Sequence, residues 1–136
     1  MIRQLDDKTL VSGQIAPHEV AGLAEQHGVT MLVNNRPDFE EPGQPLAADI
    51  EEAAAQAGIA YRFVPIIRGI GPADIEAMQQ ARGEAGEGKV LAFCRSGTRS
   101  ALAAALAMRE DGAPRDEIER CLSDAGVDSG PIAHLL

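Results

Sequence analysis

The sequence has almost no aromatic residues: one Tyr, three Phe and no Trp among its 136 residues. Such a chain is poorly supplied with the stacking surfaces that bind nucleic-acid bases. Basic residues are also few, with 12 Lys and Arg against 21 Asp and Glu, which gives a formal net charge of -9 at pH 7. A field of that sign repels phosphate backbones and anionic lipids, so we expect no nucleic acid and no membrane as partner.

Cysteine is scarce as well, with only Cys94 and Cys121. Two cysteines do not make a disulfide framework, and the absence of a C-x-x-C spacing excludes the usual zinc motif. The three histidines, His18, His27 and His134, are not spaced as a metal triad, so we expect no metal and no other cofactor. The N-terminus has no apolar run typical of a signal peptide or a membrane span, and a cytoplasmic location is the expectation.

Hydrophobic residues make up 45% of the chain, which is enough for a sizeable core. The length fits one domain over residues 1–136. Short apolar runs alternate with stretches of helical periodicity, and Gly and Pro stand at the joints. The expected strands are 9–12, 29–34, 59–67 and 89–93; the expected helices are 17–27, 46–57, 72–84, 101–108 and 114–125. This alternation predicts an α/β fold, a three-layer sandwich with a mostly parallel central sheet flanked by helices.

The most informative segment is FCRSGTRS, residues 93–100, between an expected buried strand and an expected buried helix. Such a loop lies at the carboxyl end of a strand, where α/β proteins bind ligands. Its small residues allow successive backbone N–H groups to point into one concavity, and the helix N-terminus adds positive charge. Arg95 and Arg99 bring two full charges. The segment therefore predicts an oxyanion-binding loop, formed by the backbone of residues 95–99.

Cys94 stands at the mouth of this loop, where the field that binds an anion also stabilises a thiolate. We interpret it as a nucleophile, with the Ser100 hydroxyl placed to donate a hydrogen bond to its sulfur. The alternative is a buried structural cysteine beside a tight turn. Cys121 falls on the apolar face of the last expected helix and is interpreted as a core residue.

The loop resembles those of two enzyme classes that have a cysteine at the end of a strand. In protein-tyrosine and dual-specificity phosphatases, the phosphate-binding loop reads Cys, five residues, Arg, then Ser or Thr. In rhodanese sulfurtransferases the loop is one residue shorter. Four residues separate Cys94 from Arg99, so the loop length by itself matches the rhodaneses.

The rest of the chain resembles a different group. VSGQIAPHEVAGLAEQHGVTMLVNNRPDFEEPG, AGIAYRFVPI, GPADIEAM and the CRSGTRS loop follow in the order found in the phosphatase-like domain named after beta-lactamase hydrolase-like proteins. The resemblance extends from about residue 2 to residue 108. It implies a protein-tyrosine or dual-specificity phosphatase-like fold for a family whose members are described as hydrolases or as sulfurtransferases.

The resemblance implies a phosphatase mechanism with Cys94 and Arg99 as the catalytic residues. Cys94 would attack phosphorus to form a phosphocysteine, on a phosphoester such as phosphotyrosine or a small phosphomonoester. The substrate oxygens would be bound by Arg99 and by the loop residues, namely Arg95, Ser96, Gly97, Thr98 and Ser100.

The leaving group of such a reaction needs an acid, and the family-like position in RGIGP, residues 68–72, has none. Asp74 is the nearest carboxyl group, but its place also suits stabilisation of a helix N-terminus, which we favour. Asp38 and Glu40 in the loop 36–45 are the alternatives.

The sequence is also compatible with two other functions. A sulfurtransferase would form a persulfide on Cys94 and needs no acid. A non-catalytic module would only bind an oxyanion such as phosphate or sulfate. The sequence predicts a small oxyanion or phosphoester as ligand and identifies no protein partner.

Overall fold

The computed structural model describes all 136 residues, and a five-stranded sheet forms its centre. The strands lie in the order β1-β2-β5-β3-β4. Their bounds are Ile2–Gln4 for β1, Thr9–Ser12 for β2, Val29–Asn34 for β3, Ala60–Phe63 for β4 and Lys89–Phe93 for β5. Strands β2, β5, β3 and β4 are parallel, and only the edge strand β1 runs antiparallel, against β2.

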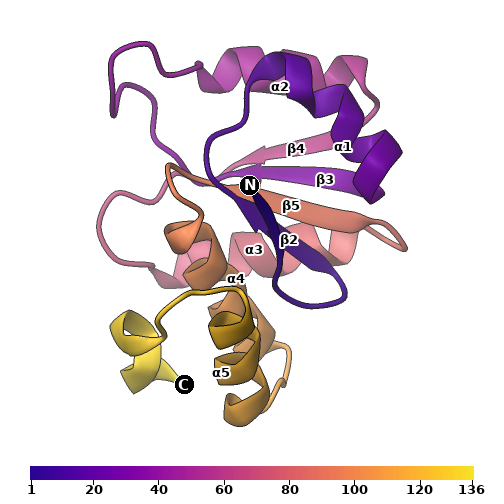
Figure 1. Cartoon of the computed structure of the whole chain (residues 1–136). Helices are drawn as coiled ribbons and strands as arrows, with labels where there is room; N and C mark the ends of the chain where they lie inside the picture. The colour runs from indigo at the N-terminus through magenta and orange to yellow at the C-terminus, as the bar shows by residue number, and fades with distance from the viewer.

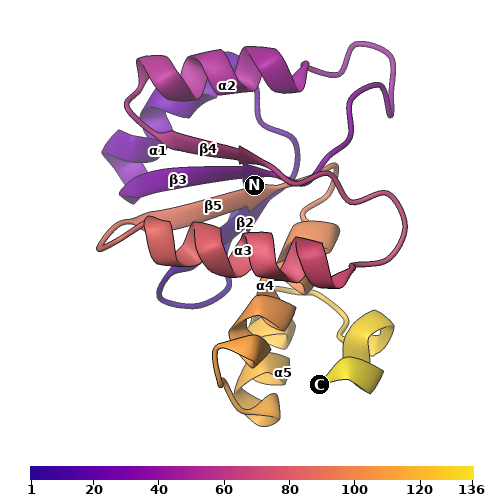
Figure 2. The ribbon, with the colours of Figure 1, turned by 180° about the vertical axis from the view of Figure 1, so that it is seen from behind.

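Helices cover both faces of the sheet (Figures 1 and 2). On one face lie α1 (Val20–His27) and α2 (Ala47–Gln56), over a core cluster of 11 buried residues that includes Leu32 and Leu91. On the other face lie α3 (Pro72–Glu84) and α4 (Thr98–Glu110), with α5 (Arg115–Asp124) packed against α4; their cluster has 24 buried residues. The predicted three-layer α/β sandwich with a mostly parallel sheet is confirmed.

Strand β5 occupies the middle of the sheet and has side chains buried on both faces, Leu91 in one cluster and Ala92 in the other. The apolar run 89–93 predicted such a strand. The chain then enters α4, in which nine consecutive residues from Ser100 to Met108 are buried. These two elements hold the intervening loop between buried, close-packed neighbours.

Several boundaries differ from the sequence prediction. Strand β4 ends at Phe63, because Pro65 lacks the N–H that a ladder needs, although Val64 N and Ile66 N still donate hydrogen bonds to Asn34 O and Asn35 O. Helix α4 begins at Thr98, three residues earlier than predicted. The segment 17–27 starts as a short 3-10 helix (Pro17–Glu19) before α1.

Two elements had no clear sequence signal. Strand β1 has three residues, and it forms because β2 offers a free edge. The 3-10 helix η2 (Gly130–Leu135) folds back over α4, and its Ile132 is buried in the larger cluster. No helix of the structure is both long and apolar enough to cross a lipid bilayer.

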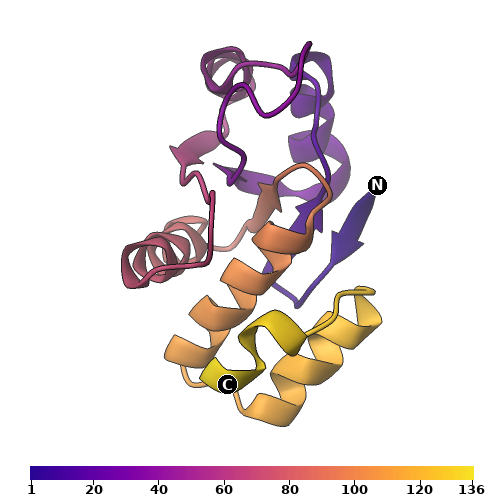
Figure 3. The same ribbon diagram turned by 90° about the vertical axis from the view of Figure 1, so that its left-hand side faces the viewer.

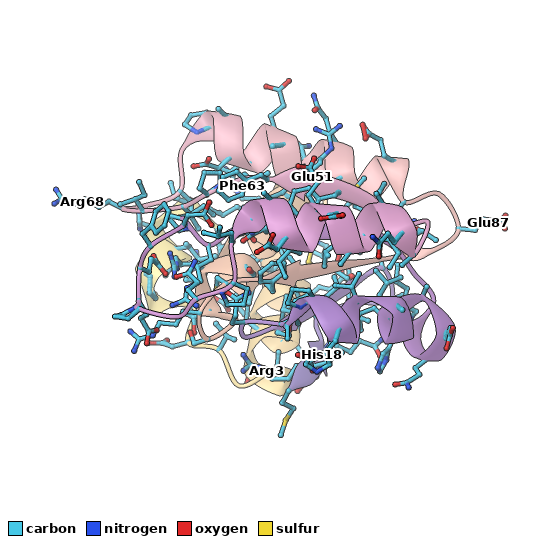
Figure 4. The ribbon with its side chains drawn as sticks, turned by 90° about the horizontal axis from the view of Figure 1, so that it is seen from above. Arg3, His18, Glu51, Phe63, Arg68 and Glu87 are labelled. Carbon is cyan, nitrogen blue, oxygen red and sulfur yellow. The ribbon has the colours of Figure 1, made fainter.

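The carboxyl ends of the four parallel strands meet at one end of the molecule. The loop after β5, the loop 36–45 after β3 and the loop 64–71 after β4 all lie there (Figures 1 and 3), and η2 lies close to the last of these. In the view from above, Arg68 of the third loop projects from this end, whereas Glu87 marks the opposite end (Figure 4). The candidate site therefore lies where the topology gathers three loops.

Candidate active site

The loop after β5 is shaped around the sulfur of Cys94. The N–H of Cys94 still donates to Ser12 O at 3.3 Å, so the residue is held at the end of the sheet. Gly97 then takes a left-handed conformation with φ 95°, and its N–H donates a hydrogen bond of 3.1 Å to the Cys94 sulfur. An α-helix leaves its first N–H groups without intrahelical partners. That of Thr98 donates to Ser96 Oγ at 3.4 Å, whereas that of Ser100 is directed at the sulfur. The predicted anion-binding loop thus has its sulfur at the floor.

Cys94 is fully buried, and burial by itself raises the pKa of a thiol. Hydrogen bonds from the backbone and the hydroxyl of Ser100, and from the N–H groups of Gly97 and Ser96, outweigh this effect. The net result is a pKa of Cys94 below its ordinary value. This environment favours a thiolate, which is the nucleophilic form of cysteine.

The hydroxyl of Ser100 has one proton and two acceptors within reach. Its Oγ donates to Oδ1 of Asn35 at 2.7 Å, while it also lies close enough to the sulfur to lower the pKa of Cys94. The amide of Asn35 is fixed in turn by a hydrogen bond of 2.9 Å from Nδ2 to Val64 O. When Cys94 is a neutral thiol, the Ser100 hydroxyl donates its proton to Asn35. A Cys94 thiolate is a stronger acceptor and competes with Asn35 for this hydrogen bond. The backbone N–H groups, which have no such competitor, are therefore the main support of the thiolate.

Arg99 lies in the first turn of α4 and its side chain reaches across the site. Its Nη1 donates to Ile66 O and to Glu40 Oε2, both at 2.7 Å, and its Nη2 donates to Glu40 Oε1 at 2.8 Å. The Nε of Arg99 bonds to no oxygen of the chain, and the guanidinium also lies within hydrogen-bonding reach of the Cys94 sulfur, so this edge can meet a ligand oxygen bound above the sulfur. The Glu40 carboxylate raises the pKa of Arg99, and the nearby Cys94 adds to this. The structure thus brings the two predicted catalytic residues together.

Glu40 belongs to a network of charges in the loop 36–45. The Arg36 guanidinium is buried, donates from Nε to Glu40 at 2.9 Å and from Nη2 to Glu41 at 2.8 Å, and so fixes both carboxylates. Hydrogen bonds from Arg99 and then from Arg36 lower the pKa of Glu40 to about 2, although its partial burial acts in the opposite direction. Glu40 is therefore a carboxylate at neutral pH and acts as an anchor for Arg99.

The side chains of the other predicted loop residues point away from the sulfur. Arg95 is exposed, and its Nε pairs with Glu41 at 2.7 Å on the outer side of the loop. The hydroxyls of Ser96 and Thr98 bond to each other at 3.2 Å and are exposed. These residues can offer a ligand their backbone N–H groups only, so the side-chain charge that we assigned to Arg95 as a ligand contact lies at the rim.

Two further residues, Arg3 and Gly13, support the loop and were not predicted as site residues from the sequence. Arg3 of β1 donates from Nη2 to Ser96 O at 3.1 Å and from Nη1 to Ala125 O at 2.7 Å, so it ties the loop to the end of α5. Gly13 lies directly beneath the loop: a Cβ there would be 2.9 Å from Arg95 O. A signal for Gly13 was present in the SGQ turn, but nothing local marks Arg3.

Comparison with known proteins places this geometry in a family. The profile of the beta-lactamase hydrolase-like protein, phosphatase-like domain, matches residues 1–110, which include the whole sheet and the site. The chain belongs to this family. Among curated relatives, a beta-lactamase hydrolase-like protein of Xylella fastidiosa strain Temecula1 is 42% identical over 132 residues, covering 95% of this chain and 30% of its own length. The chain thus spans less than a third of that relative.

Solved structures place this phosphatase-like domain among protein-tyrosine-phosphatase-like folds. A candidate phosphatase from Neisseria meningitidis superposes with a TM-score of 0.80 at 34% identity, covering 97% of this chain and 93% of the other. The structure of PTPMT1 gives a TM-score of 0.74 at 15% identity, covering 97% and 89% of the two chains. The resemblance deduced from the sequence is confirmed for the family and for the fold.

The two aspartates considered as acids cap helices in this phosphatase-like domain. Asp74 Oδ2 accepts the Gly71 N–H at 2.9 Å at the start of α3, which is the helix role that we favoured. Asp38 Oδ1 accepts the Ala47 N–H at 2.8 Å at the start of α2. Neither makes a contact with Cys94 or Arg99. Of the three acidic candidates, only Glu40 is in the site, and it is ionised.

The remaining candidates of the sequence lie elsewhere. Cys121 packs against the larger core cluster but is only partly buried, and this burial raises its pKa. His18 lies on the far side of the sheet beside Asp49 and Glu52, whereas His134 of η2 lines an apolar pocket together with Arg99. The histidines are thus dispersed, and none contacts the sulfur.

Proposed function

We propose that this chain is a cysteine-dependent phosphatase that hydrolyses a phosphomonoester through a phosphocysteine on Cys94. The observation that carries the proposal is the buried sulfur at the floor of the loop, which accepts the Gly97 N–H and toward which the N–H groups of Ser96 and Ser100 are also directed. The family and the fold agree with phosphoryl chemistry.

The first chemical step is an attack of the Cys94 thiolate on phosphorus. The S–P bond forms as the P–O ester bond breaks, and the electron pair leaves with the ester oxygen. The N–H groups of residues 95–99 bind the non-bridging oxygens, and the Nε–H of Arg99 stabilises the charge that they carry in the transition state. Because its pKa is lowered, Cys94 forms the attacking thiolate more readily than an ordinary cysteine.

The second step is hydrolysis of the phosphocysteine. A water oxygen attacks phosphorus, the S–P bond breaks, and the thiolate and inorganic phosphate are released. None of the three acidic candidates can act as a general acid for the leaving oxygen in the first step, because Asp38 and Asp74 cap helices and Glu40 is ionised. Esters of acidic alcohols, whose anions leave without a proton, are therefore the better substrates.

The test is hydrolysis of para-nitrophenyl phosphate by the purified, reduced protein. We expect turnover that is lost in Cys94→Ser and retained in Cys121→Ser, the matched control at the second cysteine. Equal turnover in Cys94→Ser and the parent protein, or no turnover between about pH 5 and pH 8, where a lowered thiol pKa has its effect, contradicts the proposal.

Sulfur transfer is the second candidate, and the lack of a free acid is the observation that favours it. The Cys94 thiolate would attack the outer sulfur of thiosulfate; the S–S bond breaks, sulfite leaves with the electron pair, and a persulfide remains. The four residues between Cys94 and Arg99 fit this chemistry as well. Intact-mass measurement after incubation with thiosulfate should then show one added sulfur in the parent protein and none in Cys94→Ser. A parent protein that gains no sulfur removes this candidate.

A further inference from the structure

An apolar pocket with a volume of about 360 Å³ lies directly beside Arg99. Its first wall is the loop after β4, with Ile66 and Ile67, and its second is α4, with Leu102 and Leu106. The third wall is η2 at the C-terminal end of the chain, with Ile132. Apart from the imidazole of His134, the lining has no aromatic ring, and Arg99 is its only Lys, Arg, Asp or Glu side chain.

Arg99 connects this pocket to the anion-binding loop. It lies in the first turn of α4 beside Ser100, whose N–H is directed at the sulfur, and residues 99, 102 and 106 share one helix face. Its guanidinium is held at Ile66 O, which belongs to the opposite pocket wall. When the anionic group of a ligand contacts Arg99 Nε, the rest of that ligand can therefore enter an apolar pocket and need not extend into bulk water.

The pocket is large enough for a substantial organic group. A dry cavity of about 150 Å³ holds a benzene ring, and this pocket has more than twice that volume. At its mouth, Ile67 is 76% exposed and Leu135 is 39% exposed, so large apolar side chains remain in contact with water. Covering them with an apolar ligand releases that water and favours binding.

We propose that this pocket binds the organic part of the substrate, and that this part contains an aliphatic chain, carried by the acidic alcohol that the absence of an acid requires. Because the lining is mainly aliphatic and offers no Phe, Tyr or Trp ring for stacking, it favours an alkyl group over an aryl group. The chain would lie between the loop after β4, α4 and η2 while its phosphate occupies the loop 94–99. The identity of the head group rests on the proposed function; the pocket itself does not.

The experiment measures the affinity of Cys94→Ser, which cannot turn over, for inorganic phosphate and for methyl, butyl, hexyl and octyl phosphate by calorimetry. We expect the dissociation constant to fall about fourfold for each methylene that enters the pocket. Dissociation constants that agree within twofold across the series overturn the proposal. Tighter binding of phenyl phosphate than of hexyl phosphate, which has the same number of carbons, overturns the aliphatic assignment.

Variants at the mouth test where the chain binds. In the background of Cys94→Ser, Ile67→Ser with Leu135→Ser should abolish most of the chain-length dependence and leave the affinity for inorganic phosphate unchanged. The matched control is Phe63→Ser with Leu46→Ser, two exposed apolar residues (44% and 39%) that lie outside the pocket. A control that lowers the chain-length dependence as much as the mouth variant contradicts the assigned site.

The failures of the two proposals are distinguishable. Chain-length dependence without turnover of any phosphoester leaves the pocket in place and removes the phosphatase. Turnover of para-nitrophenyl phosphate with equal binding of all alkyl phosphates removes only the pocket. A protein that binds neither inorganic phosphate nor any alkyl phosphate loses both.

Discussion

The two loops that meet at Arg99 are built in opposite ways. The loop after β5, residues 94–97, consists of small residues apart from Arg95, and its chemistry comes from backbone N–H groups directed at a sulfur. The facing loop, residues 36–45, contains three prolines, and its chemistry comes from ionised side chains, Glu40 and Glu41 held by a buried Arg36. The first loop supplies a positive field, and the second fixes the side chain that completes it.

The first loop therefore determines the reactivity of Cys94, whereas the second determines the position of the Arg99 side chain. Backbone N–H groups cannot rotate away from the sulfur, so the thiolate of Cys94 is stabilised whenever the loop is folded. The side chain of Arg99 is long and flexible, and two carboxylate oxygens of Glu40 together with Ile66 O remove that freedom. Changes in the first loop should therefore affect the chemistry or the fold strongly, while changes in the second should have smaller effects.

The largest effect is expected at Arg99 itself. Arg99→Ala removes the charged donor to the transferring group, and losing one such preorganised donor costs about 10²- to 10³-fold in kcat. Arg95→Ala is the matched control, because this side chain pairs with Glu41 at the rim and should change kcat less than about fivefold. Kinetics with para-nitrophenyl phosphate compare the two. Similar losses in both variants would contradict the different roles of the two arginines.

The backbone of the first loop should be sensitive to a single methyl group. At Gly97, φ is 95° and a Cβ would lie 2.7 Å from Nη2 of Arg3, so Gly97→Ala should destabilise the fold by about 2 kcal/mol. Gly83→Ala in α3 is the control: no atom lies within 4 Å of that Cβ, and the same change should stabilise by up to about 1 kcal/mol. Urea denaturation measures both, and the same sign of effect in the two variants contradicts this account of the loop.

The charge network of the second loop predicts a dependence on pH. The pKa of Glu40 is lowered to about 2 in the folded protein, so its contribution is present above the ordinary value of 4.5 and is lost as the pH falls toward 2. Solvent screening limits this contribution to about 1 kcal/mol. The free energy of unfolding should therefore fall more steeply between pH 4.5 and pH 2.5 in the parent protein than in Glu40→Gln. Parallel curves would show that Glu40 is not held by the two arginines.

Replacing the two helix-capping aspartates should have the smallest effect on turnover. Asp38→Ala and Asp74→Ala should each destabilise the protein by about 1 kcal/mol, because each removes an acceptor for an N–H at a helix start. Turnover of para-nitrophenyl phosphate at a temperature well below the unfolding transition should stay within about twofold. A fall of about 10²-fold in kcat for either variant would identify that aspartate as the acid instead.

Local patterns and long-range contacts differ in how well the sequence predicts them. The run 89–93, the small residues after it and the apolar helix predicted the loop, Cys94 and Arg99, because these features are adjacent in the chain. The bonds from Arg3 to Ser96 O and from Arg99 to Glu40 join residues 93 and 59 positions apart, and only the folded sheet brings them together. Helix η2 has weak periodicity and is brought to the pocket, as its third wall, only by the folded chain, so the sequence did not predict this role.

The most direct test of the central account is the covalent state of Cys94 during reaction. The reduced protein is mixed with para-nitrophenyl phosphate, quenched in acid and measured by intact mass and peptide mapping, with Cys94→Ser as control. The account predicts one phosphoryl group on Cys94 and none in the control. A Cys94 that remains unmodified while phosphate is released, or that gains only sulfur from thiosulfate in a parallel sample, contradicts it.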